Sequence, residues 1–244
     1  MLALQPAARP RRQKDASSVK PLKLAIANKN YSSWSMRPWV LLTQAGIEFE
    51  EIQLKFSDTG KVEGIEPYSP TRQVPVLIVD GEPVWDSLAI GEAVAELFPH
   101  KQLWPADPRA RQIARSICAE MHTGFRNLRG AMPVNIRASL PGKGMSPAVQ
   151  QDIDRIVEIW ESCRARFGQG GELLFGQFTV ADAYYAPVAT RFLTYAVTLP
   201  PAAQRYADAL LELSAVREWM AQARRETEFV RADEPYAKPG MTPA

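Results

Sequence analysis

Short apolar runs alternate with polar breaks through the first part of the chain. The short runs predict strands, and the longer runs with helical spacing predict helices. The expected strands are 22–27, 49–54, 74–79 and 83–85, and the expected helices are 36–46 and 87–98. Asp80-Gly81 is a hairpin signal between the last two strands. With a loop holding at most a short helix at 56–70, this order of elements predicts an α/β unit.

The helix ends carry their own signals. Pro38 stands near the start of the first helix, where a missing N–H costs little, and Gly46 suits its end. Ser87 is the expected N-cap of the second helix.

Beyond residue 99 the pattern contains helical spacing and no convincing strand. The proline-rich segment 99–108 predicts a linker. "TVAD" at 179–182 has the residues of a capping box, which opens a helix. The expected helices are 109–129, 148–167, 180–195, 202–213 and 215–225, with a loop at 133–147. The second half is therefore predicted to be all-α.

These patterns divide the chain into a basic tail at 1–20, an α/β domain at 21–98, the linker, a helical domain at 109–228 and a C-terminal tail at 229–244. The length of 244 residues, 46% of them hydrophobic, suits one or two domains with a real core. The fold class expected from pattern alone is α/β followed by all-α.

Charge is concentrated at the start of the chain. The tail carries five basic side chains against Asp15, a net +4, so the overall +2 leaves −2 for the rest. A nearly neutral body does not support nucleic-acid binding. The tail is expected to be disordered, with attachment to an anionic surface as the alternative.

Several classes of site lack the residues they would need. Cys118 and Cys163 form no C-x-x-C pair, and the two histidines, His100 and His122, are too few for a typical zinc cluster. No apolar run is long enough to span a membrane. We therefore expect a cytoplasmic protein without a metal.

"NYSSWSMRPW" at 30–39 places three hydroxyls and an indole where a strand should turn into a helix. The simplest explanation is helix capping, since serine is a favoured N-cap. The alternative is that the hydroxyls serve a ligand at the start of the helix.

"QVPVLIVDGEPVWDS" at 73–87 contains a second unusual arrangement. Pro75 opens a strand expected to be central, where proline cannot donate to the ladder. A cis bond after Val74 would expose the Val74 backbone to an extended peptide ligand, whereas a trans bond at a strand start remains the alternative. Asp86 and Ser87 at a helix start match the ammonium and carboxylate of an α-amino acid, or form a simple cap.

These stretches, together with "FTVADAYYAPV", resemble the cytosolic glutathione transferase family in order and spacing. The resemblance is carried by "YSSWSMRPW", "SPTRQVPVLIVDGEPVWDSLAI" and "FTVADAYYAPV", and it covers about 22–225. It implies a thioredoxin-like N-terminal domain, a helical C-terminal domain, a homodimer, and glutathione bound along the cis-proline strand. It also implies that Asp182 is structural.

The serine cluster is similar to that of serine-type members, especially the zeta-like pattern Ser-Ser-Cys-Ser-Trp-Arg. Matched by order, Ser32 is the implied catalytic serine and Ser33 the next glutathione-contacting position. A free thiol has a pKa of about 8.5, so a hydroxyl donor at a helix start would favour the thiolate. The implied glutathione-binding residues are Ser32, Ser33, Arg37, Gln73, Val74, Pro75, Asp86 and Ser87. For Arg37 an ion pair at the surface or between domains is the alternative.

The chain departs from the zeta-like pattern at Trp34, which stands in place of cysteine. This weakens the case for cis–trans isomerase activity and for thiol transfer through a cysteine. Tyr31 is an alternative activating hydroxyl. For the glycine carboxylate of glutathione the basic candidates are Lys55, Lys61 and Arg72.

A pocket for the electrophile is expected between the domains. His122, Phe125, Arg126 and Arg129 have the spacing of one helix face, and an aromatic, cationic face could hold an anionic electrophile. The alternative is an amphipathic face packed at an interface. Trp160, Tyr184 and Tyr185 are expected in the core.

Two classes of function follow. The first is an enzyme that activates glutathione toward a small electrophile, by conjugation, peroxidase-type reduction, dehalogenation or isomerisation, with detoxification as the expected role. The second is a binding or interaction protein that keeps the fold without turnover. The serine cluster and Asp86-Ser87 favour the enzyme.

Overall fold

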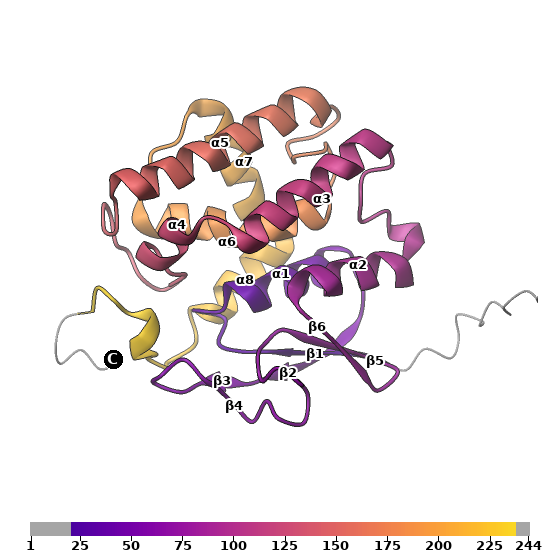
Figure 1. Cartoon of the computed structure of the whole chain (residues 1–244), viewed down its shortest axis with the longest axis vertical. Coiled ribbons are helices and arrows are strands. Elements are labelled where there is room, and N and C mark those ends of the chain that lie inside the picture. The colour runs from indigo at the N-terminus through magenta and orange to yellow at the C-terminus, as the bar shows by residue number, and fades with distance from the viewer. Residues whose placement is uncertain (1–20, 238–244) are drawn as a thin grey trace, which may run out of the picture.

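The computed structural model describes residues 21–237, so the expected basic tail at 1–20 lies outside the described residues. A small sheet forms one end of the molecule, the helices α3 to α7 form the other, and α8 lies beside α1 (Figure 1). Helices α1 (Ser33–Gln44) and α2 (Ser87–Leu97) lie between these two layers. The α/β half and the helical half predicted from the sequence are confirmed.

The main sheet has four strands in the order β2-β1-β5-β6. They are β1 (Leu22–Ile26), β2 (Phe49–Gln53), β5 (Val76–Val79) and β6 (Glu82–Trp85). β1 pairs with β2 in parallel and with β5 antiparallel, and β5 pairs antiparallel with β6. β1 packs against α1 and β5 against α2, and the apolar side chains of α1 from Met36 to Leu42 belong to the core of this half.

Three local details differ from the predictions. The first part of the segment 56–70, expected as loop with at most a short helix, contains instead a small antiparallel pair of strands, β3 (Lys55–Phe56) and β4 (Val62–Glu63). Helix α1 begins at Ser33, because Ser32 is its N-cap. The N-cap of α2 is Asp86, not Ser87, because the Asp86 carboxylate accepts the Leu88 N–H at 2.9 Å.

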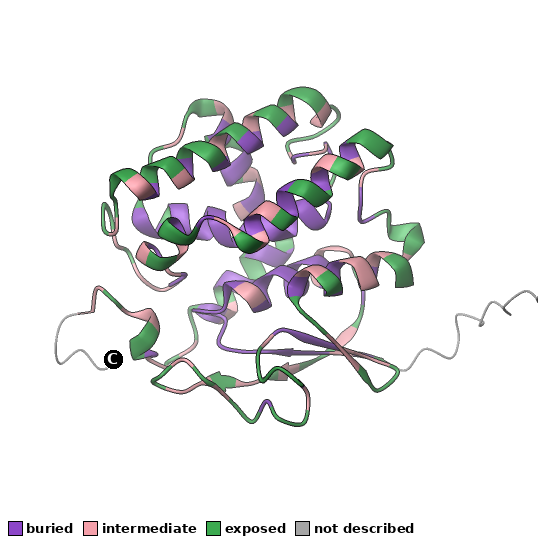
Figure 2. Ribbon diagram, viewed as in Figure 1, coloured by how far each residue is buried: buried purple, intermediate pink, exposed green. Residues whose placement is uncertain are grey.

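The helical half is built around α6 (Val180–Tyr195), which is buried along nearly all its length (Figure 2). The predicted capping box is confirmed: Asp182 accepts the Thr179 N–H at 2.8 Å. Trp160 packs on Tyr185 and Tyr206, as expected of core residues. The surrounding helices are α3 (Pro108–Thr123), α4 (Arg126–Ala131), α5 (Pro147–Phe167), α7 (Pro201–Glu212) and α8 (Ser214–Ala223).

The single helix predicted at 109–129 is wrong, because the chain turns between α3 and α4. Phe125 has a φ of 55°, in the left-handed region, and Gly124 lies where a Cβ would stand 2.7 Å from the Glu120 carbonyl oxygen. His122 therefore does not share a helix face with Phe125, Arg126 and Arg129. Phe125 is buried and Arg126 is exposed.

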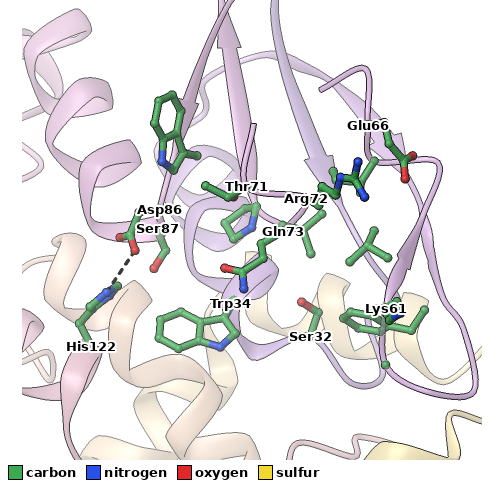
Figure 3. Close-up of a pocket in the computed structure, with 17 residues that line it drawn as sticks. Ser32, Trp34, Lys61, Glu66, Thr71, Arg72, Gln73, Asp86, Ser87 and His122 are labelled. Carbon is green, nitrogen blue, oxygen red and sulfur yellow. Dashed lines mark ion pairs between the residues drawn. The ribbon is translucent and has the colours of Figure 1, made fainter. Parts of the chain in front are cut away.

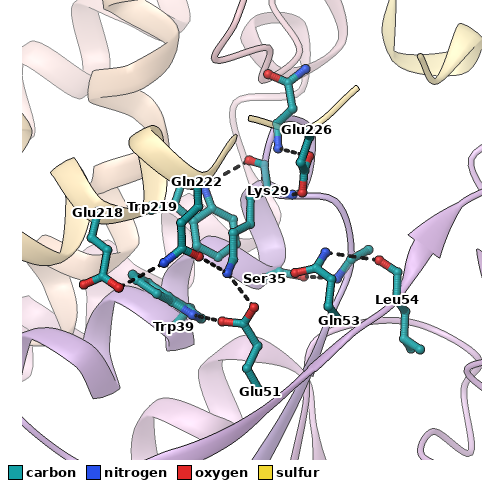
Figure 4. Close-up of polar contacts among 12 residues, drawn as sticks. Lys29, Ser35, Trp39, Glu51, Gln53, Leu54, Glu218, Trp219, Gln222 and Glu226 are labelled. Atoms are coloured by element: carbon teal, nitrogen blue, oxygen red, sulfur yellow. Dashed lines mark hydrogen bonds and ion pairs between the residues drawn. The ribbon is translucent and has the colours of Figure 1, made fainter. Parts of the chain in front are cut away.

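Lys29 lies at a polar junction between the two halves, just before the serine cluster (Figure 4). Its Nζ lies 2.5 Å from Glu51 Oε1 on β2, also bonds Gln222 of α8, and faces the rings of Trp39 and Trp219. The side chain is 4% exposed. The junction thus joins the sheet to the last long helix through one buried cation.

The residues after α8 run back over the α/β half and include a short turn, η2 (Arg231–Asp233). The Glu226 carboxylate accepts the N–H groups of Lys29 and Asn30, at 2.6 and 2.9 Å. Glu234 accepts the Tyr31 hydroxyl at 2.8 Å. The described residues after α8 therefore stabilise the turn that leads to Ser32.

Candidate active site

A cleft of about 960 Å³ lies on the α/β half, at its junction with α3. Figure 3 shows Ser32 on one side of it and Asp86 with Ser87 on the other, with Trp34 and Gln73 between them. Seven of the predicted site residues line the cleft: Ser32, Gln73, Val74, Pro75, Asp86, Ser87 and His122. The predicted residues Ser33, Arg37, Phe125 and Arg126 are not part of its lining.

Ser32 combines a helix-capping role with a position on the cleft. Its Oγ accepts the Ser35 N–H at 3.2 Å and donates to the Ser35 hydroxyl at 2.8 Å. Ser35 Oγ in turn accepts the Ala27 N–H at 3.2 Å. The two hydroxyls form a short chain at the start of α1, and its outer member faces the cleft.

Ser33 points away from the cleft, toward the helical half. Its Oγ accepts from Nη2 of Arg191 on α6, at 3.3 Å. Arg191 is buried, and burial lowers its pKa to about 9. The adjacent serines therefore have different surroundings, although the sequence makes them look equivalent.

The Val74-Pro75 bond is cis, as expected. Pairing in β5 begins only at Val76, opposite Trp85. No hydrogen bond to another described residue engages the backbone of Val74, which is partly exposed at the cleft. An extended ligand could therefore pair with this stretch of backbone.

Asp86 and Ser87 bring a carboxylate and a hydroxyl to the start of α2. Ser87 is 2% exposed, and its hydroxyl lies 2.9 Å from the hydroxyl of Tyr184 on α6. Asp86 uses Oδ1 for the cap, while Oδ2 lies 3.1 Å from His122 Nε2. A helix N-terminus with these groups suits a zwitterionic amino-acid head.

Three arginines gather behind the cleft wall formed by Trp34. The guanidinium groups of Arg37 and Arg129 lie 4.3 and 4.7 Å from the Trp34 ring centre, and Arg37 also faces Tyr184 at 4.6 Å. Arg37 makes no salt bridge with a described residue, and burial lowers its pKa to about 10. Together with Arg191, this arrangement places positive charge behind the serine cluster.

The basic candidates for a glycine carboxylate fall into two groups. Lys61 and Arg72 line the cleft on the side beyond Ser32, as Figure 3 shows. Lys55 lies outside the lining and pairs with Glu228 at 2.5 Å. The hydroxyl of Tyr31 faces Glu234 and Arg137, and burial raises its pKa.

Arg191 and Tyr184 contact predicted site residues, although the sequence predicted neither of them as part of the site. Both lie on α6, far along the chain from the residues they touch. Trp34 was noticed only as a departure from a pattern, and it forms the wall between the cleft and Arg37. No short-range sequence signal marks such contacts.

Two further features concern the described residues alone. Within 21–237, no group of three or more His, Cys, Asp or Glu side chains is arranged to hold a metal ion. Among the described helices, none is both long enough and apolar enough to cross a membrane.

Both halves of the chain match a described protein family. Residues 31–97 match "Glutathione S-transferase, N-terminal domain", and residues 146–222 match "Glutathione S-transferase, C-terminal domain". Together the two matches cover more than half of the chain.

Individual relatives are more distant. Maleylacetoacetate isomerase of Rattus norvegicus is 28% identical over 177 residues, which cover 70% of this chain and 78% of the rat protein. Protein LigF of a Sphingobium species is 36% identical over 87 residues, 33% of each chain.

Solved structures share the fold. A glutathione transferase homologue from Burkholderia, with bound glutathione, has a TM-score of 0.63 at 22% identity and covers 84% of this chain and 98% of its own. A diazinon-metabolizing glutathione S-transferase of Bombyx mori has a TM-score of 0.66 at 16% identity, with the same coverage.

Proposed function

The chain belongs to the glutathione S-transferase family, and from this premise we propose that it binds glutathione and activates its thiol toward a small electrophile. One observation carries the proposal: a single cleft presents Ser32, the unpaired Val74 backbone and the Asp86-Ser87 pair. These groups match in turn a thiol, an extended peptide backbone and a γ-glutamyl head.

The ends of glutathione would be held by charge. The Asp86 carboxylate would accept the ammonium group, and Ser87 with the α2 N-terminus would hold the γ-glutamyl carboxylate. Lys61 and Arg72 are the proposed partners of the glycine carboxylate, since both line the cleft on the side beyond Ser32.

The thiol would be activated by hydrogen bonding and by positive potential. In the Ser32-Ser35 pair the bond can reverse, so that Ser35 donates to Ser32 and the Ser32 proton turns to the sulfur. Because thiolate is the reactive form, each unit by which the thiol pKa is lowered represents about 1.4 kcal/mol of preferential thiolate binding. The positive charge of Arg37, Arg129 and Arg191 acts in the same direction.

The matched test compares two neighbouring serines. Ser32→Ala should raise the pKa of bound glutathione thiol by about 1 unit, for the loss of one hydroxyl donor, and slow turnover at neutral pH. Glutathione affinity should change little, and the rate deficit should shrink at high pH. The thiol pKa is measured from thiolate absorbance across a pH series.

Ser33→Ala is the control, because the Ser33 hydroxyl faces Arg191. It should leave the thiol pKa close to that of the wild type. If the pH signature follows Ser33 instead, the assignment of Ser32 is wrong. If both variants and the double variant behave as wild type, the cluster serves only to cap the helix.

A second candidate activity is glutathione-dependent isomerisation, which the named activity of the rat relative favours. Trp34, in place of cysteine, argues against it. The two reactions differ in thiol balance: conjugation consumes glutathione in proportion to product, whereas isomerisation leaves total thiol constant. Titrating free thiol after reaction with a panel of electrophiles, including a cis-olefinic diacid, separates them.

A binding protein without turnover is the alternative outside enzymology. It would bind glutathione in the cleft but show no thiolate absorbance on binding.

The homodimer and the cytoplasmic location expected from the resemblance are part of the proposal. Leu97, the last residue of α2, is 39% exposed and lies outside the cleft lining, so it would suit contact with a second copy. Light scattering on the purified protein tests the dimer.

A further inference from the structure

Among the described residues, His122 and Asp86 form the only contact between an imidazole and a carboxylate that joins the two halves at the cleft (Figure 3). His122 stands in the last turn of α3, and Asp86 caps α2. Their side chains are 22% and 45% exposed, so a ligand in the cleft can reach the carboxylate.

The surroundings of the imidazole determine which nitrogen carries the proton. His122 Nε2 faces Asp86 Oδ2 at 3.1 Å, whereas Nδ1 is buried and has no hydrogen-bond partner among the described residues. An N–H at Nδ1 would be a buried donor without an acceptor, which is costly. The geometry therefore favours a neutral ring that donates from Nε2 to Asp86.

The charges around His122 also favour the neutral ring. Burial lowers its pKa below the ordinary value, Asp86 opposes this, and the cations Arg37 on α1 and Arg129 on α4 add to the lowering. Arg129 also bonds the carbonyl oxygen of His122. The neutral indole of Trp34 also packs on the ring, in edge contact with centroids 5.2 Å apart.

We propose that His122 is a positioning residue for the ammonium subsite of glutathione, and that its protonation weakens glutathione binding. This rests on the proposed function. As a neutral donor, His122 holds Oδ2 in place while Oδ1 serves the cap, and both oxygens keep a lone pair for the ligand. As a cation, it competes with the ammonium group for the same carboxylate.

The sign of the pH effect follows from linkage. If protonated His122 opposes the ligand, bound ligand must equally oppose protonation, so the affinity falls as pH falls through the His122 pKa. Between about pH 5 and 7, α-carboxylates stay ionised and α-ammonium groups stay largely protonated, so the ligand's own charge is nearly constant. Asp86 should therefore meet the same ligand throughout this range.

The test measures glutathione dissociation constants by calorimetry at about pH 5 and 7 on three folded proteins. The wild type should bind about fivefold more weakly at the lower pH, the size expected of a partly exposed charge contact. His122→Gln keeps a neutral donor without a titrating proton, so it should match the wild type at pH 7 and lose the pH dependence. His122→Phe keeps a ring without a donor and should bind about fivefold more weakly at both pH values.

Turnover gives a second measurement. At pH 7, His122→Phe should raise the KM for glutathione with a much smaller effect on kcat, whereas His122→Gln should have the KM of the wild type. If His122 only packed the cleft wall, its loss would instead lower kcat, and His122→Gln would be as impaired as His122→Phe.

Several results would overturn the inference. Equal wild-type affinity at both pH values, tighter binding at low pH, or an undiminished pH dependence in His122→Gln would each do so, and in these cases the proposed function stands. Absence of glutathione binding in the wild type at every pH would overturn both.

Discussion

At the scale of single residues, the cleft is built from side chains that serve the fold and face a ligand at once. Ser32 caps α1 and lines the cleft, and Asp86 caps α2 and lines the cleft. Capping fixes each side chain by a bond to its own helix, so the ligand meets groups that are already in place. Such preorganisation reduces the entropy lost on binding.

Ser87 is not the N-cap of α2, so a substitution at Ser87 tests its contact with the ligand while the cap stays in place. Ser87→Ala should weaken glutathione binding by about 1–2 kcal/mol, through loss of a hydrogen bond to a charged carboxylate. The cap of α2 stays in place because Asp86 provides it, but the buried Tyr184 hydroxyl loses its partner, so the melting temperature should fall modestly. Calorimetric titration alongside thermal melting checks both expectations.

Tyr184→Phe is the matched control for Ser87, since it removes the hydroxyl that Ser87 contacts and leaves Ser87 itself intact. Its effect on affinity should be smaller than that of Ser87→Ala. Unchanged affinity in a folded Ser87→Ala protein would mean that the γ-glutamyl head lies elsewhere.

The position of these serines and of Asp86 at helix starts could be predicted from the sequence. The residues that they contact in the other half of the molecule could not. Serine and aspartate beside a helix start are signals within a few residues of one another. The contact between Ser33 and Arg191 joins residues 158 apart, and nothing in either stretch points to the other. Only the path of α6 through the centre brings them together.

At the scale of elements, the capping box of α6 makes hydrogen bonds within its own turn and also with residues outside α6. Asp182 accepts from Thr179 N–H and Oγ1, and also from Leu174 N–H and the Tyr206 hydroxyl. Burial raises its pKa to about 6 in spite of these bonds. The box thus ties the start of α6 to a neighbouring loop and to α7.

Asp182 should make stability depend on pH. Its folded pKa lies above the unfolded value of about 3.9, so the favourable contribution is full below that value and is lost as pH rises through about 6. Relative to Asp182→Asn, the wild type should lose about 3 kcal/mol of unfolding free energy between about pH 4 and 7. Denaturant unfolding of both proteins across this range measures the difference.

Asp107→Asn is the control, because Asp107 caps α3 at an exposed position. It reports what the same substitution does at an exposed cap, outside the capping box of α6. A constant difference for Asp182→Asn would mean that the buried carboxylate does not titrate there.

The elements themselves were largely predictable, except where one helix became two. Strands, the hairpin and the helices of the second half follow from periodicity. The break between α3 and α4 was missed because Gly124 interrupts a helical pattern that continues on both sides of it. Glycine alone is a weak signal, and the left-handed φ of Phe125 depends on packing.

At the scale of the whole molecule, Lys29 couples the two halves through a buried charge. Lys29→Met should lower the free energy of unfolding by about 2–3 kcal/mol, because Glu51 then loses its cation while remaining 30% exposed. Urea unfolding followed by tryptophan fluorescence is a suitable measurement, since Trp39 and Trp219 lie against Lys29.

The double variant Lys29→Met with Glu51→Gln removes both charges and should recover part of the loss. Recovery would identify the unpaired carboxylate as the cause. If the double variant is as unstable as the single one, the stem of Lys29 contributes through packing and the charge pair contributes little.

The contacts of Glu226, Glu228 and Glu234 with residues 29–31 have a consequence for the order of events during synthesis. The turn that leads to Ser32 is synthesised early, but the carboxylates that accept its N–H groups and the Tyr31 hydroxyl lie about two hundred residues further along the chain. While the nascent chain is still short of them, the α/β half can pair its strands, yet these donors lack their native acceptors. We therefore expect the turn before Ser32 to reach its native hydrogen bonding only after the segment beyond α8 has left the ribosome.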